Sequence, residues 1–107
     1  MTLELPNRAE IIARIRAVAP ASTQILLFGS RARGDGRADS DVDLLLIVPD
    51  SSDTRAVNRQ VRMALWGLGL GFDIVALRQA DWAKMRTDDS WFARQVSADA
   101  IGLDGAA

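Results

Sequence analysis

The stretch FGSRARGDGRADSDVDLLLIV, residues 28 to 48, decides the expected fold of this chain. It continues an apolar run that begins at residue 24, and this run predicts a buried strand that ends at a glycine. A polar segment follows, which we expect to form a loop or a short helix and a turn. The run VDLLLIV, residues 42 to 48, is apolar on both faces after its first carboxylates and predicts a second buried strand.

Two carboxylates mark the start of the second strand. Asp41 and Asp43 are two positions apart, and side chains with this spacing point to the same face of a strand. Two such anions repel each other and raise each other's pKa, so the arrangement favours a divalent cation between them. Asp73 lies in a third apolar run, residues 72 to 77, and joins the pair if that strand lies beside the second one. Three carboxylates form a site of oxygen ligands, suited to two Mg²⁺ or Mn²⁺ ions about 4 Å apart.

The residues before this pair predict a site for an anion. Gly29 and Ser30 end the first strand and open a turn. A glycine allows the backbone to approach an anion closely, and the hydroxyl and the following N–H groups can contact phosphate oxygens. Arg31 and Arg33 follow at once. They either bind phosphate or pair with neighbouring acidic residues.

The composition limits the chemistry that is open to the chain. It has 107 residues, 13 Lys and Arg against 14 Asp and Glu, and neither Cys nor His. This length predicts one domain, residues 1–107. The missing residue types exclude disulfides, thiol nucleophiles and Ser-His-Asp catalysis, so a general base must be a carboxylate. The balanced charge argues against direct nucleic-acid binding, and the lack of a membrane-length apolar run or a signal-peptide pattern predicts a cytoplasmic protein.

The rest of the chain predicts helices around these strands. We expect a first helix over residues 8 to 18, capped by Asn7 with Glu10 in a capping box and with Val18 on its buried stripe. A second helix should begin after Ser51 or Ser52. It should end near Leu68, with Arg55, Arg59 and Arg62 on its outer face. Shorter helices at 80 to 86 and 89 to 99 and an edge strand at 100 to 103 complete an α/β (α+β) domain with a small mixed sheet. The three tryptophans, Trp66, Trp82 and Trp91, are candidates for the core or for an interface.

At these residues the chain resembles the DNA polymerase beta-like nucleotidyltransferases. Gly29-Ser30, ten residues, and then Asp41-Val42-Asp43 is the signature of that superfamily, and the string GSRARG…SDVDLLL resembles its minimal nucleotidyltransferase (MNT) branch. The resemblance covers nearly the whole chain and implies the polymerase beta-like fold. It also implies that Asp41 and Asp43 bind both metal ions, and that Asp73 binds one of them and acts as the base. Gly29 and Ser30 would hold the triphosphate, and AMP would pass from ATP to a hydroxyl with release of pyrophosphate.

The length of the chain also bears on the acceptor, the molecule whose hydroxyl would receive AMP. A chain of 107 residues has no room for a separate acceptor-binding domain, so a macromolecule should supply the hydroxyl or a second subunit should complete the site. In the resembled branch the usual partner is a HEPN-type toxin encoded nearby. The leading hypothesis is an antitoxin that adenylylates its toxin on a tyrosine or another hydroxyl. An antitoxin that acts by binding alone and a dimeric small-molecule nucleotidyltransferase remain as alternatives.

Overall fold

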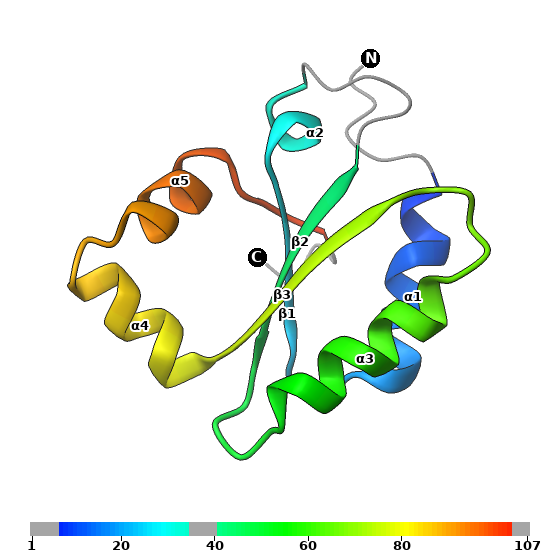
Figure 1. Cartoon of the computed structure of the whole chain (residues 1–107), viewed down its shortest axis with the longest axis horizontal. Helices are drawn as coiled ribbons and strands as arrows, with labels where there is room; N and C mark the ends of the chain where they lie inside the picture. The colour runs from blue at the N-terminus through cyan, green and yellow to red at the C-terminus, as the bar shows by residue number, and fades with distance from the viewer. Residues whose placement is uncertain (1–6, 35–40, 104–107) are drawn as a thin grey trace.

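The fold is built on a four-stranded β-sheet with helices on both of its faces (Figure 1). The computed structural model describes residues 7–34 and 41–103. In chain order the elements are α1 (Arg8–Val18), β1 (Gln24–Phe28), α2 (Ser30–Arg33), β2 (Val42–Val48), α3 (Thr54–Leu65), β3 (Phe72–Arg78), α4 (Gln79–Thr87), α5 (Trp91–Asp99) and β4 (Ile101–Gly102). This order confirms the predicted α/β domain with a small mixed sheet.

The sheet has the strand order β3-β2-β1-β4. β1 runs antiparallel to both β2 and β4, whereas β2 and β3 run parallel to each other. The short strand β4 confirms the edge strand that was expected within residues 100 to 103. Within the described residues, β3 therefore forms the opposite edge and is paired with a strand on one side only.

β2 occupies the middle of the sheet because its side chains are apolar on both faces. Leu44 and Leu46 pack into the core beneath α1 and α3, whereas Leu45 and Ile47 pack into the core beneath α4 and α5. Figure 1 shows the same division of the helices between the two faces. Fully burying a side chain of this size contributes about 1.5–3 kcal/mol. Because helices cover both faces, the ends and edges of the strands are the parts of the sheet that a ligand can reach.

The start of α1 differs from the prediction. Asn7 has a left-handed backbone conformation (φ 57°, ψ 34°), and its side chain makes no capping hydrogen bond. The predicted capping box with Glu10 is therefore wrong, because an N-cap side chain bonds the first turn from an extended backbone. Glu10 instead lies 3.7 Å from the guanidinium of Arg14, one turn later. Val18, predicted to lie on the buried stripe, is the last residue of the helix and is exposed.

The start of α3 also differs, because an aspartate takes the place of the expected serine. The Asp53 carboxylate accepts hydrogen bonds from the backbone N–H groups of Arg55 (3.1 Å) and Ala56 (3.2 Å). A carboxylate at this position satisfies free N–H groups and also interacts favourably with the helix dipole. Ser51 and Ser52 precede this cap and lie outside the helix.

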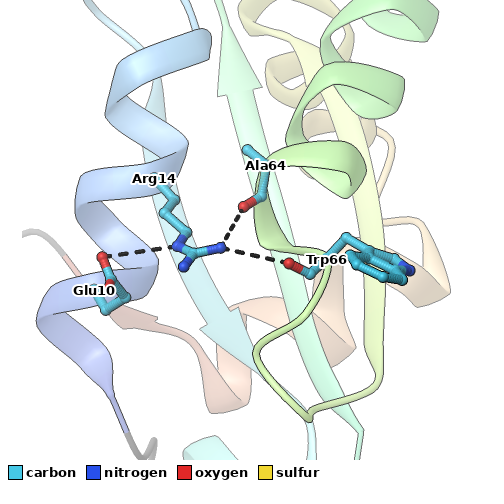
Figure 2. Close-up of polar contacts among 4 residues, drawn as sticks. All are labelled: Glu10, Arg14, Ala64 and Trp66. Atoms are coloured by element: carbon cyan, nitrogen blue, oxygen red, sulfur yellow. Dashed lines mark hydrogen bonds and ion pairs between the residues drawn. The ribbon is translucent and has the colours of Figure 1, made fainter.

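α3 ends at Leu65, three residues before the predicted end at Leu68. Trp66 has an extended backbone (φ −62°, ψ 139°) and stops the helix. Figure 2 shows Arg14 reaching across from α1, where its guanidinium donates to the carbonyls of Ala64 (3.0 Å) and Trp66 (3.4 Å). A cation at the carboxyl end of a helix satisfies free carbonyls and complements the dipole. This contact comes from another element, so the local sequence of α3 does not predict it.

The tryptophans divide between the core and the surface. Trp82 belongs to α4 and is buried between this helix and the sheet, whereas Trp66 and Trp91 are 84% and 70% exposed. Among the described residues, no helix has the length and apolar character needed to cross a membrane.

Candidate active site

Two of the predicted site carboxylates are direct neighbours on adjacent strands. β2 and β3 are parallel, and Asp43 is the register partner of Asp73. Residues paired in this way point to the same face of the sheet. That face is the one beneath α4 and α5, because Leu45 and Val75, two residues further on, pack there. Asp41 lies just before β2 and in phase with Asp43, so the three carboxylates lie at the same end of the sheet, and the charges of Asp41 and Asp73 both act on Asp43.

Gly29 lies against this acidic group. It connects β1 to α2 with φ +79°, a left-handed conformation that favours glycine. Phe28 is the register partner of Asp43, and a Cβ atom placed on Gly29 would overlap the Asp43 carboxylate. Two constraints therefore require glycine here, the backbone conformation and the close approach of Asp43. Ser30 follows as the first residue of α2.

A second glycine, Gly71, has the same relation to Asp41, and the sequence reasoning missed it. A Cβ atom on Gly71 would overlap the Asp41 carboxylate, and the Gly71 carbonyl accepts a hydrogen bond from Val42 N–H (2.8 Å). In the sequence, Gly71 ends the tract GLGLG, which indicates only a helix break. The available signal was its position directly before the strand that carries Asp73.

The carboxylates influence one another electrostatically. Burial raises the pKa of Asp43 above its usual value, and the negative charges of Asp73 and Asp41 raise it further. The nearby positive charge of Arg33 acts in the opposite direction and lowers the Asp43 pKa. A raised pKa means that the ionised carboxylate is held at a free-energy cost. A cation at this end of the sheet would reduce that cost.

The two arginines after Gly29 have different surroundings. Arg31 is buried, with only 5% of its surface exposed. Arg33 is exposed and forms an ion pair with Asp99 at the end of α5 (Nη1 to Oδ2, 2.9 Å). Asp99 is a partner that no local pattern indicated, because it lies 66 residues along the chain. Arg33 therefore links α2 to α5 beside the carboxylates.

The sequence of this chain matches a known family. Residues 9–95 match the family described as Nucleotidyltransferase domain. The chain belongs to this family. No protein of curated function matches this nucleotidyltransferase domain.

Solved structures with the same fold include components of toxin–antitoxin complexes. One, described as a toxin–antitoxin with AMP-PNP, is 24% identical with a TM-score of 0.67, over 92% of this chain and 73% of the other. A mutant of the toxin–antitoxin MntA-HpeT is also 24% identical, with a TM-score of 0.66 and the same coverage. A putative nucleotidyltransferase from Sulfolobus solfataricus is 21% identical, with a TM-score of 0.56 over 89% and 75% of the two chains. These similarities show that the fold is that of the polymerase beta-like nucleotidyltransferases.

The carboxylates of this nucleotidyltransferase domain supply oxygen ligands alone. Across residues 7–34 and 41–103, no three His, Cys, Asp or Glu side chains are arranged as a ready-made metal site. Mg²⁺ usually binds proteins through one or two carboxylates and keeps water molecules or substrate phosphates as its other ligands. Asp41, Asp43 and Asp73 are oxygen donors of the kind that Mg²⁺ prefers, and one or two of them are enough for such an ion.

Proposed function

We propose that this nucleotidyltransferase domain transfers AMP from ATP to a hydroxyl group of a partner protein. The observation that carries the proposal is the register of Asp43 with Asp73 directly beside the left-handed turn at Gly29. A turn of this kind can contact phosphate and the carboxylates beside it can bind metal ions, which supports the proposal. Phosphoryl-type transfer depends on this combination, because positioning and charge stabilisation supply most of the catalysis.

Each site residue has a distinct role in the proposed reaction. Asp41 and Asp43 would hold two Mg²⁺ ions, for which Mn²⁺ could substitute, and Asp73 would help to hold one of them. Gly29 leaves room for the Asp43 carboxylate beside the turn that would hold the triphosphate, and Ser30 offers its hydroxyl to a phosphate oxygen. When bound, the ions supply charge stabilisation to the phosphate oxygens and the leaving group.

The remaining step is the activation of the acceptor. The acceptor oxygen forms a bond to the α-phosphorus of ATP, the bond from that phosphorus to the β-phosphate oxygen breaks, and pyrophosphate leaves. Asp73 accepts the proton of the hydroxyl, since the chain contains no histidine that could do so. Arg31 and Arg33 follow the turn directly, and we assign them to the nucleotide phosphates. For Arg33 this contact would add to its ion pair with Asp99.

We further propose that the partner is a HEPN-type toxin encoded nearby and that this chain is its antitoxin, with both proteins in the cytoplasm. Two solved structures of the same fold are described as toxin–antitoxin complexes, one of them with AMP-PNP, an ATP analogue.

The test is to incubate the protein with ATP, Mg²⁺ and the product of the neighbouring gene, and then to weigh that product by intact-mass spectrometry. We expect its mass to rise by one or more AMP units, and we expect Asp73→Asn to prevent the rise. A partner that is bound and neutralised without any change in mass would show that the chain acts by occlusion alone. Transfer to small molecules but not to the partner would identify a small-molecule nucleotidyltransferase.

A further inference from the structure

A positively charged groove lies between α3 and the outer edge of β3, on the other side of β3 from β2. It has a volume of about 760 Å³, and its charged lining residues are Arg55, Arg59 and Arg62 from α3. A second hollow of about 470 Å³ also includes Arg62 and continues to Trp66 and the start of β3. All the charged residues that line the two hollows are arginines. We refer to this continuous surface as the α3–β3 groove.

The backbone of β3 is open toward this groove at Ala76, whereas the outward carbonyl of Ile74 already bonds α3. The Gly71 carbonyl accepts from Val42 N–H and so faces β2, whereas the Ile74 carbonyl accepts from the Asn58 side chain of α3 (2.9 Å) and so faces away from β2. Backbone groups alternate in direction along a strand, so the N–H and carbonyl of Ala76 also face away from β2. Among the described residues, none forms a hydrogen bond with these two groups of Ala76. An open strand edge of this kind is a template for another strand.

The arginines of the groove have few negative partners. The Arg62 guanidinium donates to the Asn58 side chain (2.7 Å), which is neutral. Arg55 and Arg59 are exposed, and within residues 7–34 and 41–103 neither of them forms an ion pair. The chain as a whole has a net charge of −1, so this groove is a local concentration of positive charge. It is complementary to an acidic ligand.

We propose that the α3–β3 groove binds an extended acidic segment of a partner protein, which adds to the sheet as a strand beside β3. The main chain of the segment would bond the outward N–H and carbonyl of Ala76, which α3 leaves open, and its carboxylates would pair with the arginines of α3. Strand addition of this kind combines backbone affinity with side-chain specificity. The strand edge favours a polypeptide over a nucleic acid, because its donors and acceptors alternate with the spacing of a peptide main chain.

The position of the groove also suggests how the segment is used. β3 carries Asp73 as its second residue, and a strand that lies along β3 passes that end of the sheet. The exposed indole of Trp66 lies at the same end of the groove and can cover an apolar side chain of the segment. The segment would thus bring the partner's acceptor hydroxyl toward Asp73. This last step rests on the proposed function, whereas binding of the segment does not.

The test uses a fluorescein-labelled peptide of four Glu-Val repeats, measured by fluorescence anisotropy at low salt and without nucleotide. In a strand, this peptide presents all its carboxylates on one face. We expect the triple variant Arg55→Gln/Arg59→Gln/Arg62→Gln to bind it at least about tenfold more weakly, as expected for losing three exposed ion pairs. The control variant Lys84→Gln/Arg86→Gln/Arg94→Gln loses the same charge on α4 and α5 and should bind normally. Ala76→Pro should also weaken binding, because it removes an outward N–H that β2 does not use.

Three results would overturn the proposal. The triple variant could bind the acidic peptide as tightly as the parent protein, a peptide of Lys-Val repeats could bind equally well, or an oligouridylate RNA could bind more tightly than the peptide through the same arginines. Circular dichroism melting of each variant shows whether it is folded, and the arginine variant remains decisive if Ala76→Pro does not fold. The shift in melting temperature with Mg²⁺ and ATP, measured in parallel, tests the proposed nucleotide site separately.

Discussion

Two regions of this molecule share strand β3 and hold opposite charges in different ways. At the start of the strand, Asp73 lies beside Asp43, in a crowded place where burial and like charges raise the pKa of Asp43. Along its outer edge, the arginines of α3 project into an open groove. Crowded like charges have a free-energy cost in the folded protein, whereas exposed arginines cost little. Substitutions at the carboxylate end should therefore change stability and chemistry together, and substitutions in the groove should change binding alone.

The largest effect should come from the carboxylate proposed as the base. Asp73→Asn keeps the shape of the side chain and removes its charge, so transfer to the partner should fall at least ~100-fold, the usual scale for losing a general base. The variant should still bind the partner, because Asp73 lies at the end of β3 and outside the α3–β3 groove. Single-turnover transfer and a pull-down measure the two properties. Equal transfer rates for Asp73→Asn and the parent protein would contradict the assignment of the base.

Gly29→Val should destabilise the fold and disturb the site at once. A branched residue at φ +79° is strained, and its Cβ would displace the Asp43 carboxylate, so we expect a loss of about 1–3 kcal/mol in the free energy of unfolding. Gly71→Ala is the matched comparison, because its Cβ would meet Asp41, which is exposed and can move. Its cost should be below about 1 kcal/mol. Urea unfolding measures both, and a larger loss for Gly71→Ala would contradict this account of the two glycines.

Asp43→Asn should stabilise the protein in the absence of metal. The raised pKa of Asp43 means that ionisation weakens the fold, so the parent loses stability as the pH rises through this pKa. The neutral variant avoids that loss, and its melting temperature should be a few degrees higher at neutral pH but equal at acidic pH. A stabilising effect of Asp43→Asn that persisted unchanged at acidic pH would show that charge is not its cause.

The melting temperature is also measured with Mg²⁺ and ATP, for the parent protein and for the double variant Asp41→Asn/Asp43→Asn. Mg²⁺ with ATP should raise the melting temperature of the parent protein by mass action on the native state. The double variant should lose that rise while remaining folded. A parent protein whose melting temperature does not change at millimolar Mg²⁺ and ATP would lack a working site.

The smallest effect is expected when the arginine variant of the groove is measured for nucleotide binding. Arg55→Gln/Arg59→Gln/Arg62→Gln should leave the Mg²⁺–ATP shift in melting temperature unchanged, because these arginines lie on α3 and the carboxylates lie on the opposite face of the sheet. Differential scanning fluorimetry is sufficient for this comparison. A loss of the nucleotide shift in this variant would mean that the groove and the carboxylate end form a single site.

Local patterns predicted most of the elements and failed at their ends. Strands β1 and β2 begin and end where their apolar runs do, and the stripe of Val57, Val61 and Leu65 marks the buried face of α3. The helix caps were harder to predict because several polar residues compete for each N-cap position. Asp53 caps α3 in place of the serines before it. Asn7 has a left-handed backbone conformation, and its side chain does not cap α1. Such choices depend on small local energies, of about 1 kcal/mol.

The sequence by itself determined that Asp41 and Asp43 share a face, because strand periodicity sets this, and it also fixed how many residues separate them from Gly29. Only the tertiary structure decided that Asp73 would be their neighbour, since that requires β3 to lie parallel to β2 in one particular register. The tertiary structure also decided three further features. These are the contact of Gly71 with Asp41, the ion pair of Arg33 with Asp99 and the open edge beside Asn58. Each joins residues that are far apart along the chain. Their proximity follows from strand order and helix packing, which no local pattern encodes.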